Sequence, residues 1–277
     1  MTDILMREDA PLTSEEWQKL DQVVIEVARH NLAARRFLSV HGPVGAGVQV
    51  VAVDHFGGLT PADIGLDAVE SAEPVELAER EYIPLTTIFK DFILRWDDIA
   101  LARQHGAEVD VTPAAAAAVM VARTEDALLF HGQDKEPGLL KTKGRTTVPL
   151  GEWETTPGAA LEAVLAGWNK LTSAGFTGHF TLVLSNNLYA KLHRVNGNTG
   201  TLEIAQIREL VKDIVPTPAL KAKQAMLVAS GPENLDLAVG QDLVTAYLGP
   251  DGMDHVFRVF ESLVLRLKRP GAICVFE

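Results

Sequence analysis

Residues 11–47 read PLTSEEWQKLDQVVIEVARHNLAARRFLSVHGPVGAG, and the fold that we predict is built around them. Thr13 followed by Glu16 is the pattern of a capping box, which marks the start of a helix. Apolar residues then recur at the spacing of one helix face, at Trp17, Leu20, Val24, Val27 and Leu32. The pattern predicts one long amphipathic helix that reaches about Arg36 and continues into an extended, glycine-rich segment.

The composition is that of an ordinary globular protein, because 47% of the 277 residues are hydrophobic and 22% are charged. No apolar run approaches the roughly 18 residues of a membrane span, and the first residues lack a secretory signal, so we expect a cytoplasmic protein. A formal net charge of −12 argues against nucleic acid as a main partner, since nucleic-acid binding depends on Lys and Arg. The single cysteine, Cys274, excludes a disulfide framework, and we expect it to be a buried, inert thiol.

Residues 48–92 carry few helix signals. Two β-prone segments, 48–53 and 83–92, flank a polar stretch that contains proline and glycine, and this arrangement predicts a long two-stranded arm. An isolated two-stranded ribbon is only marginally stable in water. The arm therefore requires a second surface, supplied by the main domain or by another subunit, and the pattern does not distinguish an intersubunit arm from an ordinary surface hairpin.

The remaining chain mixes helices and strands. A helix is expected at 96–107, and Thr-Pro pairs at Pro113 and Pro157 predict two further helix starts, with Gly132 and Gly175 at the ends. A small hairpin is expected between these two helices. Further strands are expected at 180–184, 225–230, 235–240 and 255–269, and further helices at 187–194 and 201–213. This mixed order predicts an α/β or α+β fold.

The sequence contains no recognisable catalytic or metal-binding constellation. Residues 42–47 are glycine-rich, but they follow a helix and include Pro43, and no Lys-Ser/Thr pair follows, so they do not form a phosphate-binding loop. The eight histidines form no HExxH motif, and no GxSxG nucleophile elbow is present. His193 is a candidate pore residue or a simple surface residue, and Trp96 beside Phe92 is either a packing residue or a stacking platform for an aromatic ligand.

Several segments together resemble one protein family, the encapsulins, which are bacterial and archaeal shell proteins that build icosahedral nanocompartments. The resemblance covers nearly the whole chain and rests on residues 11–49, IPLTTIFKDFILRWDDI, EDALLFHG, TLVLSNNLYAKLHR, the GQDL at 240–243 and FRVFESLVLRL. It implies an α+β fold like that of tailed-bacteriophage major capsid proteins. The implied parts are an N-terminal arm and lumen-facing helix (1–47), an extended loop (48–92), a peripheral domain (93–177 and 238–277) and an axial domain (178–237).

The resemblance also implies a function. Encapsulin shells enclose cargo enzymes, commonly a ferritin-like protein or a dye-decolourising peroxidase, and thereby serve iron storage or oxidative-stress defence. The N-terminal helix of the family binds a targeting peptide at the cargo's C-terminus. Carried over by position, the cargo-binding residues are Val27, Leu32, Arg35, Phe37, Leu243 and Tyr247. The residues implied to line a pore for ions or small molecules are His193, Asn196, Gly197, Asn198, Thr199 and Gly200.

On this resemblance the protein is a structural shell protomer and not an enzyme. We expect it to bind copies of itself and cargo, but neither nucleic acid nor membrane, and to hold no metal or cofactor. Some members of the family bind flavin, for which Trp96 is the candidate stacking residue. One alternative is a prophage major capsid protein that packages DNA, which is disfavoured by the acidic charge and by the short segment before the first helix. The other is an enzyme of unrecognised type, which is disfavoured by the lack of a catalytic constellation.

Overall fold

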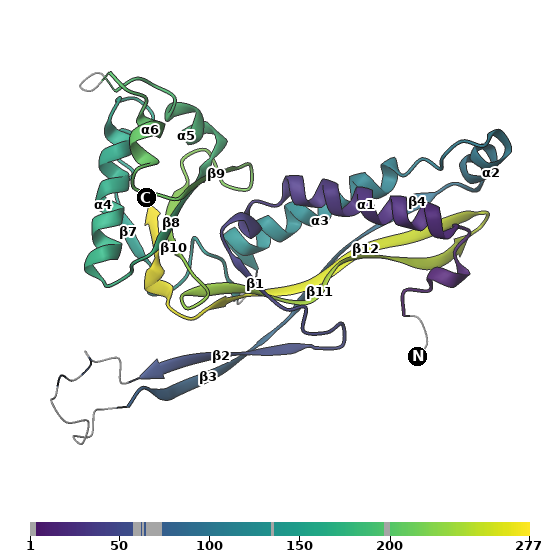
Figure 1. Ribbon diagram of the computed structural model, residues 1–277, viewed down its shortest axis with the longest axis horizontal. Coiled ribbons are helices and arrows are strands. Elements are labelled where there is room, and N and C mark those ends of the chain that lie inside the picture. The colour runs from purple at the N-terminus through teal and green to yellow at the C-terminus, as the bar shows by residue number, and fades with distance from the viewer. Residues whose placement is uncertain (1–3, 58–61, 63, 65–73, 134–135, 197–199) are drawn as a thin grey trace.

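The computed structural model describes residues 4–57, 62, 64, 74–133, 136–196 and 200–277 (Figure 1). Its helices are α1 (Ser14–Asn31), α2 (Trp96–His105), α3 (Thr112–His131), α4 (Ala159–Ser173), α5 (Asn186–Lys191) and α6 (Glu203–Ile207), with short 3-10 turns η1 (Arg7–Asp9), η2 (Ala34–Arg36) and η3 (Pro270–Ala272). Its strands are β1 (Ser39–His41), β2 (Val50–Gly57), β3 (Glu76–Pro84), β4 (Thr86–Leu94), β5 (Gly132–Gln133), β6 (Glu136–Pro137), β7 (Thr146–Val148), β8 (His179–Ser185), β9 (Asp213–Thr217), β10 (Ala225–Ser230), β11 (Leu235–Asp251), β12 (Asp254–Leu267) and β13 (Ile273–Phe276).

The long part of the molecule is a four-stranded sheet in the order β1-β11-β12-β4, with α1 and α3 lying side by side over one face (Figure 1). The alternation along β12 follows the expectation, because Phe257, Val259 and Glu261 are buried while the residues between them are partly exposed. Phe257 stacks on Phe92 of β4 and meets Trp17 of α1 edge to face. These aromatic contacts hold the first helix on the sheet.

The capping box at the start of α1 is confirmed, since the Glu16 amide donates to Thr13 and the Thr13 amide donates to Glu16. The predicted end of the helix at Arg36 is wrong. Regular α-helix stops at Asn31, and the chain tightens into η2, whose amides at Ala33 and Ala34 donate to the buried carboxylate of Asp126. A tertiary partner on α3 thus replaces the next helical turn.

The glycine-rich exit of α1 is extended, as predicted, and it lies along β11. Strand β1 pairs with β11 in parallel, and the amides of Val44 and Gly45 continue the pairing by donating to the carbonyls of Val239 and Gly240. Gly42 has φ +120° and approaches Val239 so closely that a Cβ would lie 2.4 Å from its carbonyl oxygen. Glycine is required here because a side chain would be both strained and blocked.

The two-stranded arm exists, but its boundaries differ from the prediction. β2 pairs with β3, which ends at Pro84, and this ribbon extends away from the long sheet (Figure 1). The residues expected to complete the arm, up to 92, instead form most of β4 and pair with β12. The segment 83–92 therefore contains two structural units that are separated by Leu85, and the continuous β-prone pattern concealed the change of partner.

The second sheet has five strands in the order β7-β13-β10-β8-β9, with α4 packed against it. The residues of β7 and β13 belong to the ranges 93–177 and 238–277, which the family resemblance implied to be the peripheral domain, whereas β8, β9 and β10 belong to the implied axial domain, 178–237. Hydrogen bonding joins all five strands, and β7 runs parallel to β13 as an edge strand instead of forming the expected hairpin. Cys274 of β13 is fully buried as expected, and burial raises the pKa of its thiol to about 11.

Two further helix predictions need correction. Helix α4 begins at Ala159, after Gly158, and not at the Thr-Pro pair that ends at Pro157. The expected helix at 201–213 is only the short α6, and Asp213 already starts β9, which pairs with β8 in parallel. Pairing with the buried interior strand β8 outweighs the helical pattern of these few residues.

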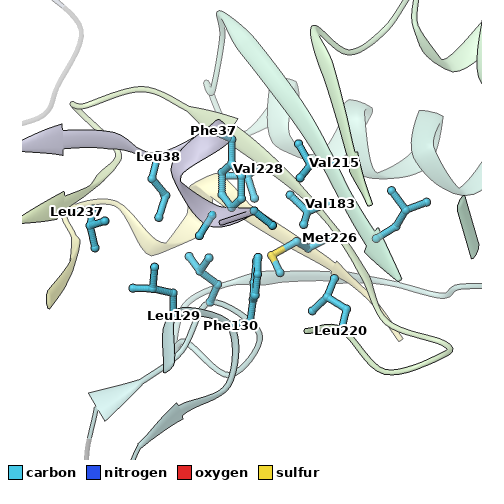
Figure 2. Packing of buried hydrophobic residues seen from close by; sticks show 14 of the residues in the cluster. Phe37, Leu38, Leu129, Phe130, Val183, Val215, Leu220, Met226, Val228 and Leu237 are labelled. Carbon is cyan, nitrogen blue, oxygen red and sulfur yellow. The ribbon is translucent and has the colours of Figure 1, made fainter. Parts of the chain in front are cut away.

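One hydrophobic cluster joins the two sheets. Phe37 and Leu38, which leave α1, meet Phe130 of α3 and the apolar face of the five-stranded sheet, including Met226 and Val183 (Figure 2). Phe37 and Phe130 stack with ring centroids 6.3 Å apart. The residues that follow the first helix therefore form the junction between the two halves of the molecule.

Candidate functional site

A shallow groove lies between α1 and β11. It has a volume of about 310 Å³, and its lining residues are Leu5, Arg7, Asp21, Val24, Ile25, Leu243 and Val244. The two charged residues of the lining neutralise each other, since Arg7 and Asp21 form an ion pair of 2.6 Å. The remaining lining side chains are aliphatic, so the groove suits an apolar ligand segment.

Leu243 is the predicted site residue that the structure places in this groove. β11 bulges on either side of Gln241, and the irregular register extends to Val244, which brings Leu243 against α1. There it contacts the small cluster of Ala28, Leu32 and Ala122. Leu32, which was also predicted, is 7% exposed and packs against Leu243 from the buried side.

The other apolar residues predicted for peptide binding are not on the groove surface. Val27 is partly buried against the main core, Phe37 is 8% exposed within the junction of the sheets, and Tyr247 is 4% exposed. The Tyr247 side chain packs on Phe257 and its hydroxyl lies 2.9 Å from His255 Nδ1. Phe37 and Tyr247 therefore present little surface to a ligand in the isolated protomer, and Val27 is half-buried outside the groove lining.

Arg35 is the centre of a buried ion cluster and is not available to a ligand. Its guanidinium donates to Glu125 on α3, Glu261 on β12 and Asp242 in the β11 bulge, with N–O distances of 2.8, 2.6 and 2.8 Å. The side chains of Glu125 and Glu261 are 0% and 1% exposed. The cluster joins η2, α3 and both long strands directly beside Leu243.

The charges in this cluster do not balance, because one guanidinium faces three carboxyl groups. Burial and the neighbouring negative charge of Glu125 raise the pKa of Glu261 from 4.5 to about 9, so Glu261 keeps its proton at neutral pH. The pKa of Asp242 is lowered despite partial desolvation, because Arg35 and the Leu243 amide donate hydrogen bonds to it; its side chain is 57% exposed. Burial raises the pKa of the neighbouring Asp126 to about 6 against the effect of its backbone donors.

Sequence reasoning missed six of the lining residues: Leu5, Arg7, Asp21, Val24, Ile25 and Val244. Ile25 carried a usable signal, because it is an apolar residue outside the buried stripe of α1, and 39% of it is exposed. Leu5 and Arg7 carried none, since they reach the groove only after the chain before α1 folds back over β11. Among the described residues, no group of His, Cys, Asp and Glu could hold a metal ion, and none of the described helices is long and apolar enough to cross a membrane.

The predicted pore residues lie at the end of the second half of the molecule. His193 is exposed and its ring meets Tyr189 edge to face, and Gly200 is exposed with φ +70°. Asn196 is 7% exposed, and its side-chain amide donates to Gln206, so it supports the loop and does not present its side chain to solvent. Gly197, Asn198 and Thr199 lie outside the described residues.

Trp96 and Phe92, which were considered together as a stacking site, lie in different environments. Phe92 is buried against Phe257, whereas Trp96 is 44% exposed at the start of α2, with its amide donating to Asp254. Asp97 and Asp98 lie in the first turn of α2, as expected for carboxylates at a helix N-terminus. The exposed indole is a single aromatic face without a second ring from Phe92.

The sequence matches the family model described as "Encapsulating protein for peroxidase" over residues 1–264. The chain belongs to this family. It is 43% identical over 280 aligned positions to the type 1 encapsulin shell protein EncA of Myxococcus xanthus, covering 100% of this chain and 97% of that protein. It is 38% identical to a diheme-cytochrome-encapsulin shell fusion protein of Kuenenia stuttgartiensis, covering 96% of this chain and 74% of that protein.

The fold agrees with this assignment. The virus-like particle of Pyrococcus furiosus superposes with a TM-score of 0.76 at 24% identity, covering 95% of this chain and all of that chain. The capsid of Myoviridae phage XM1 superposes with a TM-score of 0.66 at 14% identity, covering 89% and 91%. The α+β capsid fold is confirmed, and the protein is an encapsulin shell protomer, a structural protein of an icosahedral compartment and not an enzyme.

Proposed function

We propose that this encapsulin shell encloses a cargo enzyme by binding the cargo's C-terminal targeting peptide in the groove between α1 and β11. The observation that supports this proposal most directly is the groove's aliphatic lining, to which Leu5, Ile25 and Leu243 contribute, while the two charged lining residues, Arg7 and Asp21, pair with each other. Burial of apolar surface contributes about 2.5 kcal/mol per 100 Å², so a short peptide can bind with modest affinity. Many such sites on one shell then retain a cargo oligomer by multivalency.

The cargo that we propose is a ferritin-like protein or a dye-decolourising peroxidase, which would give the compartment a role in iron storage or oxidative-stress defence. Two observations on relatives support this choice. A Pyrococcus furiosus relative, 26% identical, is described as a ferritin-like-encapsulin shell fusion protein, and the family description refers to peroxidase. We further propose that residues 193–200 line a pore that admits ions or small molecules, and that the shell itself binds no cofactor.

The protein expressed alone should assemble into uniform hollow particles tens of nanometres across. Size-exclusion chromatography and negative-stain electron microscopy measure the size of the particles. The ratio of the ultraviolet absorbance of nucleic acid to that of protein shows whether the particles contain DNA. DNA-filled particles would instead support the prophage capsid alternative, and a small monomer or dimer would contradict both. On the same sample, uptake of ferrous iron tests the pore proposal, and visible absorbance would contradict the absence of a cofactor such as flavin at Trp96.

Replacing Leu243 with aspartate should strongly reduce cargo loading while leaving particle assembly intact. The new carboxylate would lose its hydration against an apolar peptide, and we expect binding to weaken by about tenfold or more. The measurement is the amount of a fluorescent protein with a Leu/Gly-rich C-terminal tail that co-purifies with the shell.

Leu243→Met is the matched control for this experiment, because it keeps the volume and apolarity of the side chain and should load normally. Equal loading by Leu243→Asp and Leu243→Met in assembled particles would mean that the peptide binds elsewhere on the shell.

A further inference from the structure

Residues 4–10 cover an otherwise open part of the β11 edge. β1 pairs with β11 only at residues 236–238, and the extended exit of α1 continues the pairing to Gly240. Further along the same strand, the Tyr247 amide donates to the carbonyl of Leu5. An uncovered strand edge can pair with an added peptide strand through its free backbone groups. Where residues 4–10 cover the edge of β11, a ligand has to bind in another way.

Arg7 fastens this segment to both walls of the groove. Its guanidinium donates to both carboxylate oxygens of Asp21 on α1, at 2.6 and 2.8 Å. The same guanidinium donates to the Thr245 carbonyl on β11, at 2.9 and 3.1 Å, and its carbon lies 4.5 Å from the centre of the Trp17 ring. A planar guanidinium can make these contacts at once, whereas a lysine ammonium cannot.

We infer that Arg7 is a positioning residue for cargo recognition, which holds residues 4–10 as a fixed third wall of the α1/β11 groove. This inference rests on the proposed function. The fixed wall has two consequences for the ligand. Leu5 adds apolar surface beside Ile25 and Val244, and the occupied edge at Tyr247 prevents strand addition. The targeting peptide is therefore recognised through its apolar side chains and not through main-chain pairing with β11.

The inference also concerns the charge of the ligand. Arg7 and Asp21 are the charged lining residues of the groove, and they are paired in bidentate geometry. No lining cation is left to bind a terminal carboxylate in the described part of the chain. A targeting peptide that continues for a few Gly and Ser residues past its apolar part should load as well as one that ends there.

The test compares Arg7→Met, Arg7→Lys and Asp21→Asn with the wild type, using assembled particles and a fluorescent protein with a Leu/Gly-rich C-terminal peptide. Arg7→Met should weaken loading by about tenfold, because it removes charge-assisted hydrogen bonds on both walls. Arg7→Lys should fall between the wild type and Arg7→Met. Asp21→Asn keeps the bonds to Thr245 and serves as the second variant if Arg7→Met does not fold.

Amide hydrogen exchange of residues 4–10 shows whether Arg7 acts by holding this segment in place or by stabilising the whole protein. We expect faster exchange in this segment together with reduced loading, while particle size stays unchanged. Arg95→Met is the control, because Arg95 forms an exposed ion pair with Asp97 on α2, and it should change neither readout.

Two results would overturn the inference. Faster exchange with unchanged loading would show that the segment is not part of the site. Higher loading would show that it is a lid that competes with the peptide. Failure of the proposed function has a different signature, because the wild type and all variants would then load no peptide, and this outcome would overturn the wall as well.

Discussion

Replacing Arg35 with methionine should destabilise the protein by about 3–5 kcal/mol, which is the usual cost of removing one partner from a buried ion cluster. The substitution leaves the carboxyl groups of Glu125 and Glu261, both almost fully buried, without their shared donor. It also releases Asp242, which the guanidinium holds in the β11 bulge. We therefore expect the packing of Leu243 against α1 to loosen together with the loss of stability.

The measurement is the midpoint of thermal unfolding of purified Arg35→Met at pH 7, which should fall by on the order of 10 °C. Arg95→Met is the matched control, because both partners of its ion pair are exposed, and such pairs contribute about 0–1 kcal/mol. The loss should shrink at lower pH, where carboxyl groups take up protons. Equal midpoints for the two variants would contradict a structural role for the Arg35 cluster.

Raising the pH should destabilise the protein through Glu261. The pKa of this carboxyl is about 9 in the folded protein and 4.5 in the unfolded chain, because burial and Glu125 disfavour its charged form. Between these values the folded state binds the additional proton. The stabilisation is therefore complete below about pH 4.5 and is lost as the pH rises towards 9, with a slope of at most about 1.4 kcal/mol per pH unit.

The groups that face Glu261 are Arg35 from η2, Glu125 from α3 and Asp242 from β11. Asp126 on α3 has a pKa of about 6, raised from 3.8, so it also lowers the stability of the folded protein as the pH rises, but only below about pH 6. Asp242 has a lowered pKa, so its contribution has the opposite sign and appears at acidic pH. The loss of stability between pH 6 and 9 is thus assigned to Glu261, because Cys274, with a pKa raised from 9.0 to about 11, adds a loss of the same sign only at higher pH.

Glu261→Gln tests this assignment, because a neutral amide imitates the protonated carboxyl and cannot titrate. We expect the thermal midpoint of the wild type to decline between pH 6 and 9 and that of Glu261→Gln to decline much less. Parallel profiles for the two proteins would mean that another group causes the alkaline loss.

Local sequence signals predicted the elements whose pattern is complete within a few residues. The capping box of Thr13 and Glu16, the glycine end of α3 at Gly132 and the alternation along β12 were all correct. The family resemblance extended this to the capsid fold, because it uses many segments at once. Errors occurred where a neighbour in space outweighed the local pattern, as in the premature end of α1 at the Asp126 carboxylate.

The candidate site was predicted only in part. Leu243 lines the groove and Leu32 packs against it from the buried side, whereas Phe37 and Tyr247 are core residues. The apolar character of a residue does not by itself show whether its side chain is buried or faces a ligand. Arg35 was chosen as a ligand-binding cation, whereas its guanidinium donates hydrogen bonds to three carboxyl groups of the protein itself. Two of these come from positions 90 and 226 residues away in the chain, so their meeting could not be read from spacing.

The amino-acid sequence was sufficient for a mixed helix-and-strand fold, for the first helix and its start, and for the lack of local catalytic motifs, because each depends on periodicity, turn chemistry or short-range spacing; the capsid fold itself was implied by the family resemblance. The tertiary structure was needed for the place where β4 leaves the arm, the five-stranded sheet that includes the C-terminal strand, the Arg35 cluster and the wall formed by Arg7. These features depend on contacts between residues far apart in the chain. Burial, charge neutralisation and strand pairing act only once those residues are brought together.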